Sequence, residues 1–330
     1  MTRIATAALA AALGMSGCGG SGGAGDGTVV PLTRQESQCV TAGWSRLSIV
    51  VDGTARQVLW KAPPAPWTRG AIVVLHGGGG SYTNFCAANV ALIEPQVRFA
   101  AQALEAGFAV FLPDSSDRVT DDAGRLCGKV WDDEPRTRPN VDLPFIGALL
   151  AERIAALRPA GSASAQFVVG HSSGGFMAVR AARRFGDRIA AFASVAGGDP
   201  YGWYRDCTPR PTDRPNVFGG GFDRETRRQI VEPGACDAEA YPQEQRWDDN
   251  PAVARPPFRV LHHEQDGILD RSCVDKQRSQ LRAHGHLEHA PLTVQGGPRS
   301  ADVHYWLDAY NAPLIDYFAR GHSVRGSGAP

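Results

Sequence analysis

The sequence lacks a net charge, because 34 lysines and arginines balance 34 aspartates and glutamates. Binding to nucleic acid or to an anionic membrane surface is favoured by a basic field, so neither partner is expected. The seven cysteines include no Cys-x-x-Cys pair. This absence argues against a zinc ribbon and against thioredoxin-like redox chemistry.

The N-terminal region has no apolar run long enough to span a bilayer. Its apolar stretch covers only residues 4–15, between Arg3 and the small residues at 16–18. A stable membrane-spanning helix needs about 20 apolar residues. A positive residue, a short apolar core and small residues in this order are typical of a signal peptide. We therefore expect residues 1–18 to direct export.

The end of this segment, Leu-Gly-Met-Ser-Gly-Cys at residues 13–18, resembles a bacterial lipobox. The resemblance implies that Cys18 is lipidated and that the protein is anchored to the cell envelope through this lipid alone. The alternative is a plain secretory peptide and a secreted protein. Residues 19–35 begin with many glycines and are expected to form a flexible tether. Residues 36–330 are then one domain.

Six cysteines remain beyond Cys18, an even number. In an exported protein this number favours disulfides, but six cysteines allow about 15 pairings and the sequence does not choose among them. Buried free thiols are the alternative. The candidates are Cys39, Cys86, Cys127, Cys207, Cys236 and Cys273.

A composition of 43% hydrophobic and 21% charged residues is typical of a chain that buries a real core. Asp52-Gly53 predicts a hairpin between residues 46–51 and 56–60. Beyond it, apolar runs alternate with amphipathic segments, which predicts an α/β fold with a mostly parallel sheet covered on both faces. We expect strands at 71–75, 108–112, 165–169, 189–196, 258–262 and 292–294, and helices at 96–105, 141–157, 176–185, 273–283 and 305–318.

Residues 199–256 interrupt this alternation. They contain many prolines, arginines and aromatic residues and show little periodicity. A long stretch without regular structure inside a compact domain is usually functional or disordered. We therefore interpret this segment as an irregular insertion that helps to form the substrate pocket.

The sequence Gly170-His171-Ser172-Ser173-Gly174 lies between a predicted strand and a predicted helix. This is the context that a G-x-S-x-G nucleophile turn requires, because the turn is tight and its flanking positions need glycine. The alternative is an ordinary glycine-rich turn. The context favours Ser172 as a nucleophile.

Four glycines follow His76 at the end of the strand predicted at 71–75. Glycines leave backbone N–H groups open to a ligand, and we expect an oxyanion hole made by the N–H groups of Gly78 and Ser173, with Gly79 as the reserve donor. A flexible loop or a phosphate cradle is the alternative. A phosphate loop would continue with lysine, which Ser81-Tyr82-Thr83 lacks.

A serine hydroxyl needs a base within reach and an acid that orients the base. In parallel sheets such groups lie at the carboxyl ends of strands. His304 follows the last predicted strand and is the expected base. Asp266 follows the strand at 258–262 and is the expected acid, with Asp270 and Asp199 as rivals.

The resulting chain order, Ser172, Asp266, His304, is the order of an α/β-hydrolase. We expect His76 and His171 to hold their turns, and His262 to orient the loop beside the acid. This chemistry needs no metal and no organic cofactor.

These segments resemble the secreted esterases that include polyhydroxybutyrate depolymerases and feruloyl esterases. The resemblance is carried by Leu75-His76-Gly77-Gly78, by residues 170–177, by residues 186–197 and by Val303-His304-Tyr305-Trp306. It implies an α/β-hydrolase that cleaves a polyester, an aryl ester or an acylated sugar. A peptidase or other acyl hydrolase on the same fold is the main alternative. A surface binding protein without activity is the third.

Overall fold

The computed structural model describes residues 31–120, 124, 129–133, 138–200, 220–223, 228–231, 250 and 252–325. Residues 33–330 form one compact unit. The predicted signal peptide, Cys18 and most of the predicted tether and insertion lie outside the described residues. None of the helices in the described ranges is both long and apolar enough to cross a membrane.

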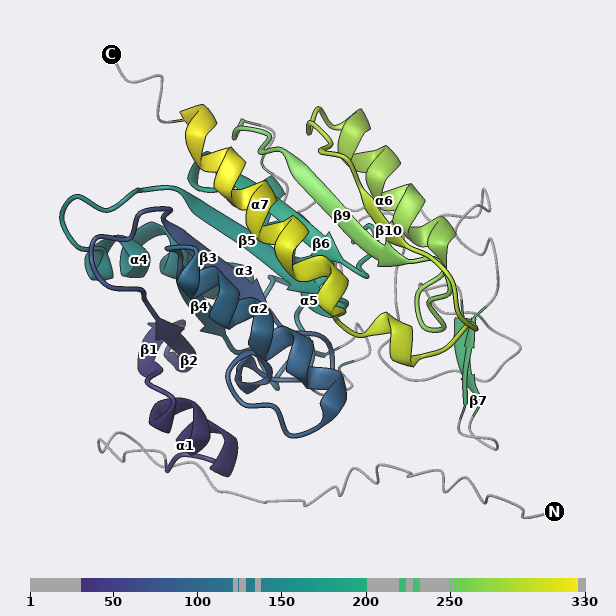
Figure 1. Ribbon diagram of the computed structural model, residues 1–330, viewed down its shortest axis with the longest axis horizontal. Coiled ribbons are helices and arrows are strands. Elements are labelled where there is room, and N and C mark those ends of the chain that lie inside the picture. The colour runs from purple at the N-terminus through teal and green to yellow at the C-terminus, as the bar shows by residue number, and fades with distance from the viewer. Residues whose placement is uncertain are drawn as a thin grey trace. The chain divides into compact units, whose positions relative to one another are not determined.

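A single mixed sheet organises the domain (Figure 1). Its eight strands have the order β1-β2-β4-β3-β5-β6-β9-β10. Strand β2 pairs antiparallel with β1 and with β4, whereas the other neighbours are parallel. The predicted mostly parallel sheet is therefore confirmed. The bounds are β1 Ser45–Val51, β2 Thr54–Lys61, β3 Ala71–Leu75, β4 Ala109–Pro113, β5 Gln166–His171, β6 Ala191–Val195, β9 Phe258–His263 and β10 Leu292–Val294.

Helices cover both faces of the sheet, as a sheet with apolar side chains on both faces requires. Every side chain of β3 is buried. On one face, α2 (Glu94–Glu105) and α7 (Asp308–Arg325) lie side by side across the sheet in Figure 1 and share one hydrophobic core. A second core lies on the other face, under α3 (Leu143–Ala148), α5 (Ser173–Phe185) and α6 (Arg271–Ala283).

Two predicted helices differ most from the structure. The one expected over 141–157 is divided, because a π-helical turn at Leu149–Arg153 separates α3 from α4 (Ile154–Leu157). The last helix begins three residues later than predicted and continues to Arg325. Neither difference moves a candidate site residue out of its loop.

The prediction of a tether up to residue 35 is wrong at its end. Helix α1 (Arg34–Thr41) already begins there, because Thr33 Oγ accepts the Glu36 N–H at 3.2 Å while the Glu36 carboxylate accepts the Thr33 N–H at 2.6 Å. This reciprocal cap satisfies two backbone donors that a helix start leaves open. A disulfide between Cys39 and Cys86 then joins α1 to the segment after the glycine loop.

The described part of the insertion at 199–256 is not wholly irregular. Strands β7 (Gly220–Asp223) and β8 (Arg228–Val231) pair antiparallel in a sheet of their own. Gly220 and Gly221 weaken the period-2 pattern by which a strand is recognised in sequence. The prediction of a segment without regular structure is therefore corrected for these residues.

Candidate active site

The turn between β5 and α5 holds Ser172 in a strained backbone conformation. Its φ of 52° and ψ of −119° lie outside the regions that most residues adopt. A side chain at Gly170 would collide with the Gly174 carbonyl, and one at Gly174 with the Leu75 carbonyl. Only glycine fits at either flank, so the local sequence permits the turn and the packing enforces it.

The structure brings the predicted serine, histidine and aspartate together. His304 Nε2 lies 2.9 Å from Ser172 Oγ, and His304 Nδ1 lies 2.7 Å from a carboxylate oxygen of Asp266. The rival Asp270 instead caps α6, accepting the Ser272 N–H at 2.9 Å. Although 132 residues separate Ser172 from His304, both lie at loops where parallel strands end, and this geometry makes them neighbours.

Asp266 is 1% exposed, and both of its carboxylate oxygens accept hydrogen bonds. One of its oxygens accepts the N–H groups of Ile268 and Leu269 at 2.7 and 2.9 Å, and the other accepts His304 Nδ1–H. Burial raises the pKa of a carboxyl group, but His304, the Leu269 N–H and His262 outweigh it here and hold the pKa of Asp266 below its ordinary value. The side chain is therefore a carboxylate at neutral pH.

Two of the three predicted oxyanion donors have no acceptor among the residues that the structure describes. Gly79 N–H donates to the Lys129 carbonyl at 2.7 Å, so it is not available to a ligand. Within the described ranges, neither the Gly78 nor the Ser173 N–H has an acceptor. The two backbones are adjacent, because a Cβ placed on Gly78 would lie 3.7 Å from Ser173 Cβ. Adjacent backbone donors of this kind are what an oxyanion hole requires.

The remaining histidines near the site hold loops, as expected. His171 Nε2–H donates to the His304 carbonyl at 2.8 Å, which joins the serine turn to the histidine loop. Burial, together with nearby His304, lowers the pKa of His171 to about 3, so it is a neutral donor. Burial also lowers the pKa of His262, whose Nε2 lies 3.6 Å from Asp266.

Sequence reasoning missed Trp131, which packs against the site. It lies between the strand predicted at 108–112 and the helix predicted at 141–157, where the sequence predicts no helix or strand, yet its side chain is completely buried. The available signal was a large aromatic residue in an otherwise polar stretch. Such a residue is buried when its indole N–H finds an acceptor, as it does here at the His76 carbonyl.

The disulfide prediction is confirmed for the three described cysteines. Cys39 pairs with Cys86, and Cys273 is disulfide-bonded as well. Cys127, Cys207 and Cys236 lie outside the described residues, and their pairing stays a prediction.

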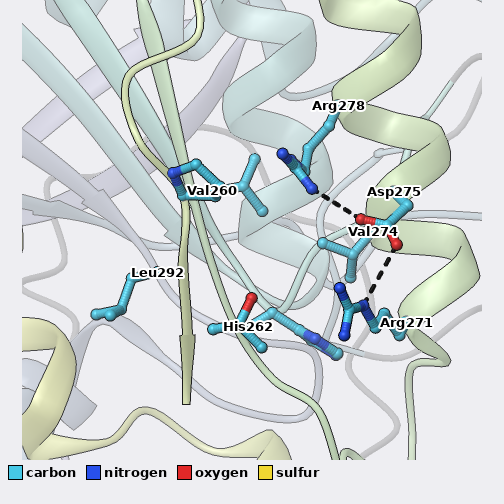
Figure 2. A pocket seen from close by; sticks show the side chains of 9 residues that line it. Val260, His262, Arg271, Val274, Asp275, Arg278 and Leu292 are labelled. Atoms are coloured by element: carbon cyan, nitrogen blue, oxygen red, sulfur yellow. Dashed lines mark hydrogen bonds and ion pairs between the residues drawn. The ribbon is translucent and has the colours of Figure 1, made fainter. Parts of the chain in front are cut away.

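A small pocket has His262 in its lining (Figure 2). It lies between α6 and the strands β9 and β10, and its volume of about 10 Å³ has room for about one water molecule. Asp275 pairs there with Arg271 and Arg278, at 3.4 and 2.9 Å. This pocket cannot hold an organic substrate. In the part of the chain that the structure describes, no group of acids, histidines and cysteines has an arrangement that could hold a metal ion.

A family model described as the alpha/beta hydrolase family matches residues 72–325. Among solved structures, the chain is similar to a thermostable esterase, with TM-score 0.50 and 13% identity over 84% of this chain and 62% of that one. It is similar to an acylaminoacyl peptidase of Pyrococcus horikoshii, with TM-score 0.52 and 14% identity over 87% and 43% of the two chains.

It is also similar to a 2,6-dihydroxy-pseudo-oxynicotine hydrolase, with TM-score 0.51 and 16% identity over 90% and 76% of the two chains. The chain thus spans less than two thirds of the esterase and of the peptidase. At these identities the likeness shows the fold alone, and it confirms the predicted fold class. No curated protein matches the chain in sequence.

Proposed function

The chain belongs to the alpha/beta hydrolase family, and from this premise we propose that it is an exported serine hydrolase of carboxylic esters. The observation that carries the proposal is the hydrogen-bonded series of Ser172, His304 and Asp266 beside two open backbone donors. Family membership alone would not suffice, because one fold hosts many reactions.

The geometry supports a two-step reaction through an acyl-enzyme. Ser172 Oγ attacks the ester carbonyl carbon while its proton passes to His304 Nε2. The tetrahedral intermediate then breaks its bond to the alcohol oxygen, and His304 returns the proton to that oxygen. In the second step a water molecule gives its proton to His304, attacks the acyl carbon and releases the acid, and Ser172 recovers its hydroxyl proton.

Asp266 and the backbone donors lower the energy of the charged states in this reaction. The carboxylate fixes His304 with its proton on Nδ1 and stabilises the imidazolium that forms. The N–H groups of Gly78 and Ser173 would bind the oxyanion. Losing one such donor typically costs about 3 kcal/mol of transition-state stabilisation.

The proposed substrate class is a polyester, an aryl ester or an acylated sugar. It is supported by the resemblance of residues 75–78, 170–177 and 303–306 to polyhydroxybutyrate depolymerases and feruloyl esterases. A peptidase is the second candidate, because an acylaminoacyl peptidase shares the fold. The two differ in the leaving group, an alcohol or an amine, and the same triad serves either.

Export and a lipid anchor at Cys18 are part of the proposal. They are supported by the signal-like residues 1–18 and by the Cys39–Cys86 disulfide, since disulfides persist in oxidising compartments. Fractionation of expressing cells tests this point. The protein should sediment with membranes and become soluble when Cys18 is replaced by alanine, and recovery of both forms in the cytoplasm would contradict export.

Turnover of p-nitrophenyl butyrate by the purified protein tests the activity. Ser172→Ala should abolish turnover and labelling by a fluorophosphonate probe, whereas Ser48→Ala, at an exposed position on β1, should change neither. Undiminished turnover in Ser172→Ala would refute the proposal. Hydroxybutyrate oligomers, methyl ferulate and a peptide amide, assayed side by side, then rank the substrate classes.

A further inference from the structure

The segment Lys129–Asp133 hydrogen-bonds to both halves of the site that would bind the oxyanion. The Lys129 carbonyl accepts the Gly79 N–H at 2.7 Å, on the glycine loop. The Trp131 N–H donates to Ser173 Oγ at 3.1 Å, at the first residue of α5. One short segment thus bridges two backbones whose N–H groups must point at the same oxygen.

The Trp131 indole adds a third bond to this bridge. Its Nε1–H donates to the His76 carbonyl at 2.8 Å, where β3 passes into the glycine loop. The indole packs against the His76 ring, with ring centroids 5.2 Å apart. Without the indole donor, the buried His76 carbonyl at the base of the glycine loop would lose its hydrogen-bond partner. The cost of that unpaired carbonyl would favour a shift of the loop.

Charged side chains hold the segment itself in place. The Asp132 carboxylate binds Arg138 through both oxygens, at 2.7 and 3.1 Å, and the Asp132 carbonyl accepts Arg180 Nη1 at 2.8 Å. The Asp132 N–H donates to the Asp142 carboxylate, which pairs with Arg56. Arg180 and Ser173 both belong to α5. This helix therefore holds the segment at two points, the Asp132 carbonyl and the Trp131 N–H. Such a doubly anchored segment has little freedom to move.

Room at the glycine loop is also limited by this segment. A Cβ placed on Gly78 would lie only 3.2 Å from Val130 Cγ1. The loop is therefore pressed against the segment where its open N–H group lies. Preorganised donors lower a transition state because they need no rearrangement when charge develops.

We propose that Trp131 is a positioning residue that fixes the Gly78 and Ser173 N–H groups for the oxyanion. It acts through the backbone of both loops and touches no substrate. The inference rests on the proposed function. It predicts a specific kinetic signature, because a displaced donor weakens transition-state binding and leaves ground-state binding nearly unchanged.

The test compares Trp131→Phe with Trp67→Phe. Both tryptophans are buried in the same hydrophobic core. Trp67 comes before β3 in the chain, however, whereas the glycine loop of the site comes after it. In Trp131→Phe, kcat for p-nitrophenyl butyrate should fall about 10- to 100-fold, while KM should change less than about twofold. This fall in kcat is smaller than the fall expected when a whole donor is removed. In Trp67→Phe, kcat should stay near wild type.

A transition-state analogue separates positioning from a general structural role. The ketone 1,1,1-trifluoropentan-2-one carries the propyl group of butyrate and forms a tetrahedral adduct with an active serine. Its inhibition constant should rise in parallel with the fall in kcat/KM of Trp131→Phe. Unchanged inhibition, or a kcat equal to that of Trp67→Phe, would overturn the inference.

A second variant covers the case in which Trp131→Phe does not fold. Ser173→Ala keeps the backbone donor and removes only the hydroxyl that accepts the Trp131 N–H, so kcat should fall about 10-fold with the same change in ketone inhibition. Wild-type kinetics in Ser173→Ala would contradict the inference. Failure of the proposed function would look different, because Ser172→Ala would then retain turnover.

Discussion

The neutral, buried His171 should make the protein sensitive to mild acid. The residue is 4% exposed, and the pKa of about 3 in the folded protein compares with an ordinary value of 6.5. Between these two pH values the unfolded chain binds a proton at this histidine and the folded protein does not. Stability therefore falls as the pH falls below about 6.5, and the loss from this residue ends near pH 3.

The size of the effect follows from the two pKa values. At pH 5 the histidine of the unfolded chain is almost wholly protonated. Proton binding to the unfolded chain then lowers the free energy of unfolding by about 2 kcal/mol relative to pH 8. This is a sizeable fraction of the 5–15 kcal/mol that typically stabilises a domain.

Urea unfolding of wild type and of His171→Gln, each at pH 8 and at pH 5, measures this loss of stability. Glutamine keeps a donor that can reach the His304 carbonyl but takes up no proton. Other acid-sensitive groups, such as Asp266, are common to both proteins and cancel in the comparison. The free energy of unfolding of wild type should fall by about 2 kcal/mol more than that of His171→Gln. Equal losses in the two proteins would refute the reasoning.

Two further predictions concern the acid and the disulfide. Asp266→Asn should lower kcat by about 10⁴-fold, because an amide favours the wrong His304 tautomer. The control Asp275→Asn changes a half-exposed carboxylate on α6 and should retain wild-type kcat. Equal rates in the two variants would remove Asp266 from the mechanism. Replacing both Cys39 and Cys86 by serine should lower the free energy of unfolding by about 4 kcal/mol, since the bond closes a loop of 47 residues. Thermal unfolding of the double variant checks this value against wild type under reducing and non-reducing conditions, and no difference from oxidised wild type would contradict it.

Local rules made the serine turn and its neighbours predictable. A strand that enters a tight turn with glycine at both flanks leaves few alternatives, because any side chain at Gly170 or Gly174 meets a carbonyl. The parallel sheet then placed the candidate acid and base, since loops at the carboxyl ends of strands meet at one edge. The capping box at Thr33 and Glu36 was equally local, and its residues were available in the sequence although the helix was not predicted.

The tertiary structure alone decided which groups face one another across long separations. The glycine loop offered Gly78 as the expected donor and Gly79 as the reserve, and the Lys129 carbonyl accepts the Gly79 N–H. The pairing of Cys39 with Cys86 depends on where α1 packs, and the burial of Trp131 depends on the His76 carbonyl. Backbone conformation is governed by a residue and its near neighbours, whereas hydrogen-bond partners are governed by packing of the whole domain. The sequence by itself therefore determined the parts of this site, and packing decided which of their hydrogen-bonding groups remain open.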